Sequence, residues 1–153
     1  MPDISAFASV LHVLAAIVWV GGMFFAYMVL RPSLGVLEPP QRPRLWNTVF
    51  PRFFAWVWVA VIVLPATGYA MVFAAFGGFA DAGVHVHVMH ALGWVMIALF
   101  VFLYAVPFRR FQSALAGGGE AAGHLTLVRR IVAVNLVLGL ITPAVAAWGR
   151  FAA

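Results

Sequence analysis

The chain of 153 residues contains no cysteine and no lysine, and only 8% of its residues are charged. Without cysteine it can form no disulfide, thiolate metal site or iron–sulfur cluster. Average soluble domains carry about 25% charged residues, so this sequence has too few charges to cover a water-exposed surface. These absences exclude a soluble enzyme, a nucleic-acid-binding protein and a disordered chain. All nine basic residues are arginines, and the formal net charge is +5. We expect no nucleic-acid partner.

Apolar residues make up 65% of the sequence and fall into four long runs. A bilayer core about 30 Å thick needs about 20 apolar residues per helix. The runs of that length are residues 4–30, 53–76, 84–108 and 127–148. They predict an all-α fold, namely an integral membrane four-helix bundle with short loops, in a single transmembrane domain over residues 1–153. Asp3 stands where a signal peptide would have a basic segment, so we expect the first run to be retained.

The arginines indicate which side of the membrane each connection faces. Four lie in or beside the first connection and four flank the third, namely Arg31, Arg42, Arg44, Arg52, Arg109, Arg110, Arg129 and Arg130. Cytoplasmic loops of membrane proteins are enriched in basic residues. We therefore expect a multi-pass protein of the lipid bilayer with both termini outside and the arginine-rich connections in the cytoplasm.

Histidine is frequent for a chain with so few polar side chains. His12 lies about two turns into the first apolar run, and His85, His87 and His90 begin the third. With the termini outside, these four fall in the outer half of the membrane. Polar side chains within a membrane are costly and mostly face the bundle interior, so we predict that these four histidines bind a metal. The alternative for His85 and His87 is an interfacial position, and we expect His124 to be a solvated loop residue.

Haem b suits this pattern, because it takes one or two imidazoles from facing helices. His12 and one of His87 and His90 are the candidate axial ligands. The candidate pocket residues are two tryptophans, a glycine that admits a flat macrocycle, and two polar groups for a propionate or a substrate, namely Trp19, Trp94, Gly22, Asn135 and Thr67. The alternative for the polar groups is hydrogen bonding between helices. We expect a membrane redox protein, an electron carrier or oxidoreductase, with a quinone, porphyrin or small oxidant as partner.

Copper is the alternative metal. Imidazole and thioether are suitable copper ligands, and Met89 lies between His87 and His90. A copper-binding or copper-transport protein would use the four outer histidines without a porphyrin. A structural subunit of a larger complex is a third interpretation. Small residues allow close helix approach, so a homo-oligomer is also open; these residues are Gly68, Ala133 and Gly139.

One segment of the sequence resembles known families. The first run contains Leu11-His12, six further residues, and then Trp19-Val20-Gly21-Gly22-Met23-Phe24. This pattern resembles the first helix of the HemJ-type protoporphyrinogen oxidases and of the related CopD (copper resistance D) membrane domains. The resemblance implies a four-helix protein of the bacterial inner membrane, and it makes His12 an axial haem ligand.

The chain departs from the HemJ pattern in two places. The HemJ lysine at the start of helix 3 has no counterpart, because the sequence has no lysine. Leu136 follows Asn135 at the position where the HemJ pattern has Glu. We therefore do not extend protoporphyrinogen oxidase activity to this chain, and whether it is an enzyme stays open.

The haem hypothesis is testable by absorption spectroscopy. Full-length protein purified from haem-sufficient cells should show a Soret band, and replacing His12 should abolish it because the iron loses an axial ligand. Spectra of the oxidised and reduced protein measure both effects. Protein without a Soret band would exclude haem, and an unchanged spectrum after the His12 substitution would exclude His12 as its ligand.

Overall fold

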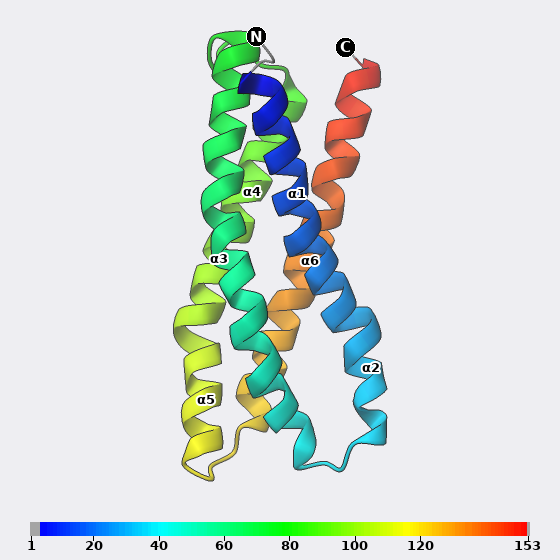
Figure 1. Cartoon of the computed structure of the whole chain (residues 1–153), viewed down its shortest axis with the longest axis vertical. Helices are drawn as coiled ribbons and strands as arrows, with labels where there is room; N and C mark the ends of the chain where they lie inside the picture. Colours follow the sequence, from blue (N-terminus) through cyan, green and yellow to red (C-terminus); the bar gives the residue numbers. More distant parts are fainter. Residues whose placement is uncertain (1–3, 153) are drawn as a thin grey trace.

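The computed structural model describes residues 4–152, and every regular element in that range is a helix (Figure 1). Four helical segments are long and apolar enough to cross a membrane: Ser5–Val36, Gln41–Phe76, Val84–Ala116 and Ala122–Gly149. The predicted all-α four-helix membrane bundle is thereby confirmed.

Two of the four segments are subdivided and two are continuous. The first consists of α1 (Ile4–Phe24), a π-helical stretch (Phe25–Leu30), α2 (Arg31–Ser33) and a 3-10 turn (Leu34–Val36). The third consists of α4 (Val84–Leu103), a π-helical stretch (Tyr104–Phe108) and α5 (Arg109–Ala116). The second and fourth are the uninterrupted helices α3 (Gln41–Phe76) and α6 (Ala122–Ala152). The second π-helical stretch contains Pro107, whose missing N–H prevents a regular helical hydrogen bond.

The chain begins and ends at the same end of the bundle (Figure 1). The connection at residues 77–83 lies at that end too, while the connections at residues 37–40 and 117–121 lie at the opposite end. We call the half with the chain ends the outer half, and the half with the arginine-rich connections the inner half. These names follow the orientation expected from the arginines.

The helices extend further toward the inner end than the apolar runs do. α3 begins at Gln41 instead of residue 53, the third segment ends at Ala116 instead of residue 108, and α6 begins at Ala122 instead of residue 127. The prediction of these boundaries was wrong because it followed hydropathy, which falls where the arginines begin. Arginine is nevertheless a good helix former, and its long side chain can carry the charge out to the membrane surface.

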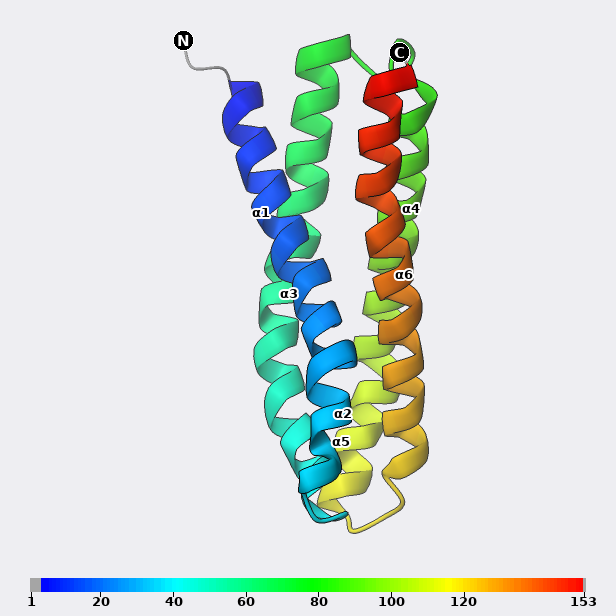
Figure 2. The same cartoon turned by 90° about the vertical axis from the view of Figure 1, so that its right-hand side faces the viewer.

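The bundle is built from two pairs of helices. α1 packs along α3, α4 packs along α6, and the pairs meet chiefly through α1 and α6. Figure 2 shows the two pairs side by side. Gly139 of α6 lies where they meet: a Cβ built on it would be 2.8 Å from Cγ2 of Val20 in α1 and 3.1 Å from Cε of Met96 in α4. The missing side chain of Gly139 therefore lets three helices of the same chain approach one another.

The buried core lies mainly in the middle and the inner half, and its centre is aromatic. Trp46, Phe50 and Phe54 are spaced four residues apart, so they share one face of α3. Their rings stack with centroid distances of 4.6 Å and 5.1 Å, and all three side chains are buried. Phe108 and Phe100 pack edge-on against Phe54, at 5.0 Å and 5.6 Å. We call Trp46, Phe50 and Phe54 the aromatic column.

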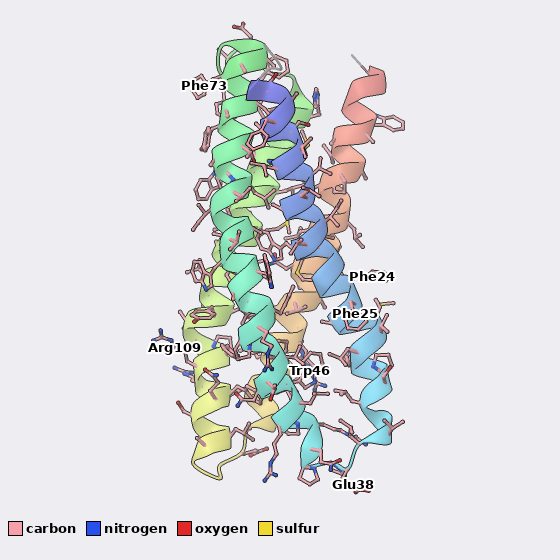
Figure 3. All side chains as sticks on the ribbon, in the orientation of Figure 1. Phe24, Phe25, Glu38, Trp46, Phe73 and Arg109 are labelled. Carbon is pink, nitrogen blue, oxygen red and sulfur yellow. The ribbon has the colours of Figure 1, made fainter. Side chains whose placement is uncertain are left out.

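Large apolar side chains also cover the outside of the bundle. Phe24, Phe25 and Phe73 point away from the helices (Figure 3), and about half of each side chain is exposed. Helices that are apolar on all faces are typical of membrane spans. This lateral surface of the bundle is the one that contacts lipid.

The junction at Gly139 gives a prediction with a matched control. Gly139→Ala should lower the free energy of unfolding by about 1–2 kcal/mol, because the stiff Val20 side chain has to shift to admit the new methyl group. Gly93→Ala should leave it unchanged or raise it by up to about 1 kcal/mol, since alanine favours the helix and a Cβ there meets nothing within 4 Å. Unfolding of the detergent-solubilised protein, followed by circular dichroism, measures both. Equal effects of the two substitutions would contradict this packing.

Candidate metal-binding site

His12 of α1 and Thr67 of α3 form a hydrogen bond across the first helix pair. Nδ1 of His12 lies 2.9 Å from Oγ1 of Thr67. The Thr67 hydroxyl donates to the carbonyl oxygen of Val63 at 2.6 Å. A hydroxyl has a single proton, so Thr67 accepts from His12 and the Nδ1 atom of His12 carries the proton. The lone pair of Nε2 is then free, and Nε2 is the atom of His12 that can bind a metal.

The residue after Thr67 also lies beside the His12 ring. A Cβ on Gly68 would lie 3.5 Å from Cε1 of His12, so the ring already lies in contact distance of this position. Thr67 is buried, with 8% of its surface exposed, and His12 is half-buried. Two consecutive residues of α3 thus lie against the imidazole: Thr67 forms a hydrogen bond with Nδ1, and Gly68 lies beside the ring.

His87 and His90 lie near the outer end of α4, around the ring of Phe79. They are three residues apart and share one face of the helix. Their rings lie 5.9 Å and 4.8 Å from the Phe79 ring, measured between centroids. Nε2 of His90 is also 3.4 Å from the hydroxyl oxygen of Tyr69 in α3, a long hydrogen bond. His87 is exposed and His90 is half-buried, so this pair lies at the outer rim of the bundle.

His85 faces a different helix. A Cβ on Gly149 of α6 would collide with the His85 ring, so the imidazole lies directly on the backbone of α6. Gly149 is buried by this contact. His85 therefore belongs to the α4–α6 interface, whereas His90 reaches α3.

The four outer histidines share one half of the bundle but not one coordination sphere. Within the described residues, no three histidine or acidic side chains lie close enough to hold a metal ion together. His12 and His90 are instead linked through α3, where their partners Thr67 and Tyr69 are two residues apart. The prediction that His124 is a solvated loop residue was wrong: it lies in the first turn of α6, half-buried, and lines an open depression with Arg109 and Arg110.

Four methionines place thioether sulfurs at levels from the outer rim to the centre of the bundle. Met23 of α1 and Met96 of α4 are buried in the core, with 2% and 5% of their surfaces exposed. Met71 is half-buried and four residues from Thr67, so the two share a face of α3. Met89 is half-buried beside His90 in the sequence. Methionine donors are thus present both at the outer rim and in the centre of the bundle.

The predicted pocket residues differ in burial and in the side chains that they contact. Trp19 is buried and packs edge-on against Phe100 at 6.1 Å, whereas Trp94 is about half exposed. A Cβ on Gly22 would overlap the Phe53 ring, so an aromatic side chain already fills the space beside this glycine.

Asn135 links two helices in the centre of the bundle. It is buried, and its Nδ2 donates to the carbonyl oxygen of Met96 at 3.1 Å, which joins α6 to α4. Asn135 and Thr67 therefore both form hydrogen bonds between helices, the alternative that the sequence left open.

Sequence reasoning did not identify Phe79 or the pairing of His12 with Thr67. Phe79 is the one aromatic residue in the connection at residues 77–83, among glycine, alanine and aspartate, and that isolation was the available signal. The His12–Thr67 pair joins residues 55 positions apart, and spacing along the chain gives no signal for such a contact.

Four membrane-spanning helices, with histidines in the outer half and methionines from the outer rim to the centre, define a small multi-pass membrane protein. Residues 47–149, more than half of the chain, match the family model of copper resistance protein D, CopD. The chain belongs to the CopD family. No curated protein and no solved structure matches it.

The family match confirms the CopD part of the resemblance and leaves the HemJ part a prediction. The matched residues contain Thr67, His85, His87 and His90, but not His12. The sequence pattern that suggested the family lies in the first helix, outside the match. Two separate parts of the chain therefore point toward the same family.

The His12–Thr67 contact can be measured by a double-mutant cycle. The single variants His12→Phe and Thr67→Val and the double variant should show a coupling in the free energy of unfolding of about 0.6 kcal/mol, and at most about 1.7 kcal/mol, because such values are typical of hydrogen bonds between membrane helices. The same cycle with Thr142→Val in place of Thr67→Val is the control, since the Thr142 hydroxyl bonds only within α6, to the carbonyl of Leu138. Equal coupling in the two cycles would contradict the contact.

Proposed function

We propose that this protein binds copper, as Cu(I), in the outer half of the bundle and takes part in copper handling at the cell membrane. The observation that carries the proposal is the match to copper resistance protein D over residues 47–149. The chemistry of the side chains supports it, because imidazole nitrogen and thioether sulfur are the ligand types suited to copper, and thioether selects the Cu(I) state.

The outer rim is where an ion would first meet the protein. His87 is exposed, and Met89 and His90 follow it within one turn at the outer end of α4. Side chains at this level are reachable from the aqueous side, so they can take up an ion without moving a helix. We assign them the role of the first copper contact.

His12 is the deeper donor. Its Nδ1 is engaged by Thr67, which leaves Nε2 free and fixes the orientation of the ring. An imidazole held in this way needs no rearrangement when it binds an ion. The buried thioethers of Met23 and Met96 lie further along the bundle and extend the series of donors toward its centre.

The series of histidine and methionine donors ends at the outer end of the aromatic column. Trp46, Phe50 and Phe54 are buried in the inner half and stack against one another. The one methionine on the inner side of Met23 in the first segment, Met28, is 53% exposed on the outside of the bundle. We therefore propose binding and transfer within the outer half, and not conduction of copper through the bundle to the inner side.

Haem b remains a separate prediction for the same half of the protein. The free Nε2 of His12 fits an axial ligand, but the Phe53 ring occupies the space beside Gly22 that the haem hypothesis assigned to the macrocycle. A quinone or porphyrin partner, a homo-oligomer and a place in the bacterial inner membrane likewise stay predictions. The absorption spectrum separates the two hypotheses, because Cu(I) gives no Soret band.

Copper binding should depend on His12 and not on His124. Purified protein should bind Cu(I) in competition with a chromogenic chelator. His12→Gln should lower the affinity for Cu(I) at least about tenfold, because the substitution removes one copper ligand. Thr67→Val should lower it by about 10- to 100-fold, since removing the partner of a metal-binding imidazole has effects of that size.

His124→Gln is the matched control for this experiment. It removes an imidazole from the same chain, but on the inner side, and should leave the affinity unchanged. A wild-type protein that binds no Cu(I), or equal losses in His12→Gln and His124→Gln, would contradict the proposed site.

A further inference from the structure

A second group of polar side chains lies at the inner end of the bundle, on the side of the membrane opposite to the outer histidines. It lines an open depression between the third segment and α6, which offers a space of about 370 Å³. The lining residues are Ala105, Val106, Arg109, Arg110, Ser113 and His124. Small-molecule sites in proteins have volumes of about 300–1,000 Å³. The depression therefore has room for a ligand of the size of a lipid headgroup.

The lining changes from apolar to polar along the third segment. Ala105 and Val106 belong to the π-helical stretch and lie within the third apolar run. Arg109 and Arg110 follow that run directly, and Ser113 lies about one turn further toward the inner end. A phospholipid in the inner leaflet has the same order, with the acyl chains first and the headgroup beyond them. The order of the lining thus matches a lipid better than a freely soluble anion.

The polar part of the lining is positively charged and contains no acid. Arg109 and Arg110 contribute two guanidinium groups, and His124 adds an imidazole from the first turn of α6. Glu120 is exposed in the connection before α6 and is not part of the lining. Like charges in one depression repel each other, so the two guanidinium groups favour an anion between them.

Phosphate is the anion that these donors match best. A guanidinium group has five N–H donors and binds phosphate oxygens through two parallel hydrogen bonds. The Ser113 hydroxyl is a further donor, and its spacing of four and three residues from Arg109 and Arg110 places it on their side of α5. Basic pockets between membrane helices on the cytoplasmic side are typical binding sites for anionic phospholipid headgroups.

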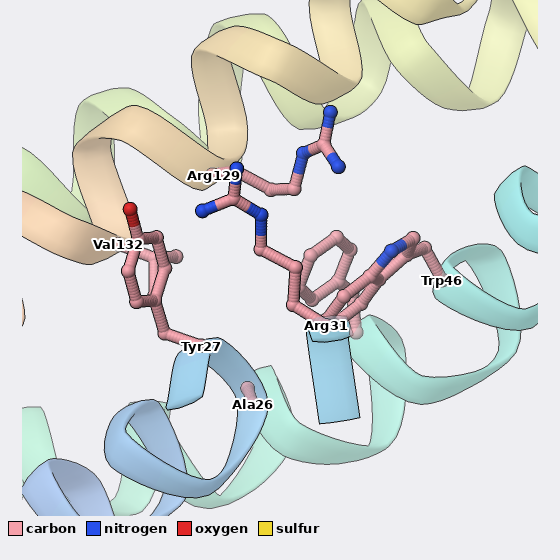
Figure 4. A pocket seen from close by; sticks show the side chains of 7 residues that line it. Ala26, Tyr27, Arg31, Trp46, Arg129 and Val132 are labelled. Carbon is pink, nitrogen blue, oxygen red and sulfur yellow. The ribbon is translucent and has the colours of Figure 1, made fainter. Parts of the chain in front are cut away.

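Another pair of arginines on the same membrane side lacks these properties. Arg31 of α2 and Arg129 of α6 extend toward a small pocket beside Tyr27 and Trp46 (Figure 4). This pocket has room for a single water molecule, about 10 Å³. The guanidinium carbon of Arg31 lies 4.9 Å from the centre of the Tyr27 ring, and Nη2 of Arg129 donates to Oγ1 of Thr126 at 3.4 Å. These two arginines are engaged within the protein and serve as a matched control.

We propose that the depression lined by Arg109, Arg110, Ser113 and His124 binds the headgroup of an anionic phospholipid at the inner membrane surface. The two guanidinium groups hold the phosphate, and the apolar part of the lining contacts the beginning of the acyl chains. The site is separate from the copper donors and does not rest on the proposed function.

The test compares two lipids that share their acyl chains and differ in the headgroup. Full-length protein in mild detergent is titrated with dioleoyl phosphatidylglycerol or with dioleoylglycerol, and native mass spectrometry measures the bound fraction. Phosphatidylglycerol should bind at least about tenfold more tightly, because hydrogen bonds from charged groups hold its phosphate. Equal binding of the two lipids would overturn the proposal. Inorganic phosphate at the concentration of the lipid should not displace it, and displacement would overturn the assignment to a lipid.

Variants assign the binding to the depression. Arg109→Gln/Arg110→Gln should weaken the apparent affinity for phosphatidylglycerol at least about tenfold. Arg31→Gln/Arg129→Gln removes the same charge from the same membrane side and should leave the affinity unchanged. Equal losses in the two double variants would overturn the site. If the first glutamine variant does not fold, Arg109→Lys/Arg110→Lys decides, because it keeps the charge and loses the parallel hydrogen bonds: weaker binding supports the proposal, and unchanged binding overturns it.

Discussion

The stacking of Trp46, Phe50 and Phe54 is the interaction on which the arrangement of the bundle depends. The three rings share one face of α3, and side chains from the third segment pack edge-on against them, so that the inner half is filled by apolar atoms. Lipid offers no hydrophobic driving force between helices, and close packing has to supply the stabilisation. Aromatic pairs suit this task because each adds about 0.5–1.5 kcal/mol beyond the area it buries. The column fills the inner core with aromatic rings, and the proposed copper donors lie in the outer half.

The outer half is held together differently. Its buried side chains are few, namely Ala8, Thr67 and Val72, and hydrogen bonds and glycine contacts take over part of the packing. The His12–Thr67 bond joins α1 to α3, and the contact of His85 with Gly149 joins α4 to α6. His12 and His85 therefore each lie against the helix that they face, and the four histidines do not converge on one point. Donors at separate positions suit successive binding of an ion better than a single closed coordination sphere.

Much of the fold could be predicted from the sequence. The four apolar runs give the number of spans, and the distribution of arginines predicts which connections lie on the same side of the membrane. The inner boundaries of the helices could not be predicted, since hydropathy reports where the lipid ends and not where the helix ends. The histidines were identifiable as polar residues within apolar runs. Their partners were not: hydropathy gives no helix face for an all-apolar segment, and Thr67 is 55 residues from His12. Arg31 and Arg129 were visible only as orientation signals, because their approach depends on how α2 meets α6.

The first helical segment makes contacts at both ends of the bundle, although it lies outside the residues that match the CopD family model. It brings His12 to Thr67 and Gly68, and it brings Tyr27 and Arg31 to Trp46 and Arg129. The partner residues Thr67, Gly68 and Arg129 lie within the matched range, and Trp46 lies one residue before it, so the matched part holds groups whose contacts only the first segment can complete. A site built across two such parts forms only when α1 is packed against α3 and α6. The same packing passes through Gly139, where α1, α4 and α6 meet. The junction of the helix pairs therefore lies between the outer histidines and the inner arginines, and it holds α1 against α6 in the middle of the bundle.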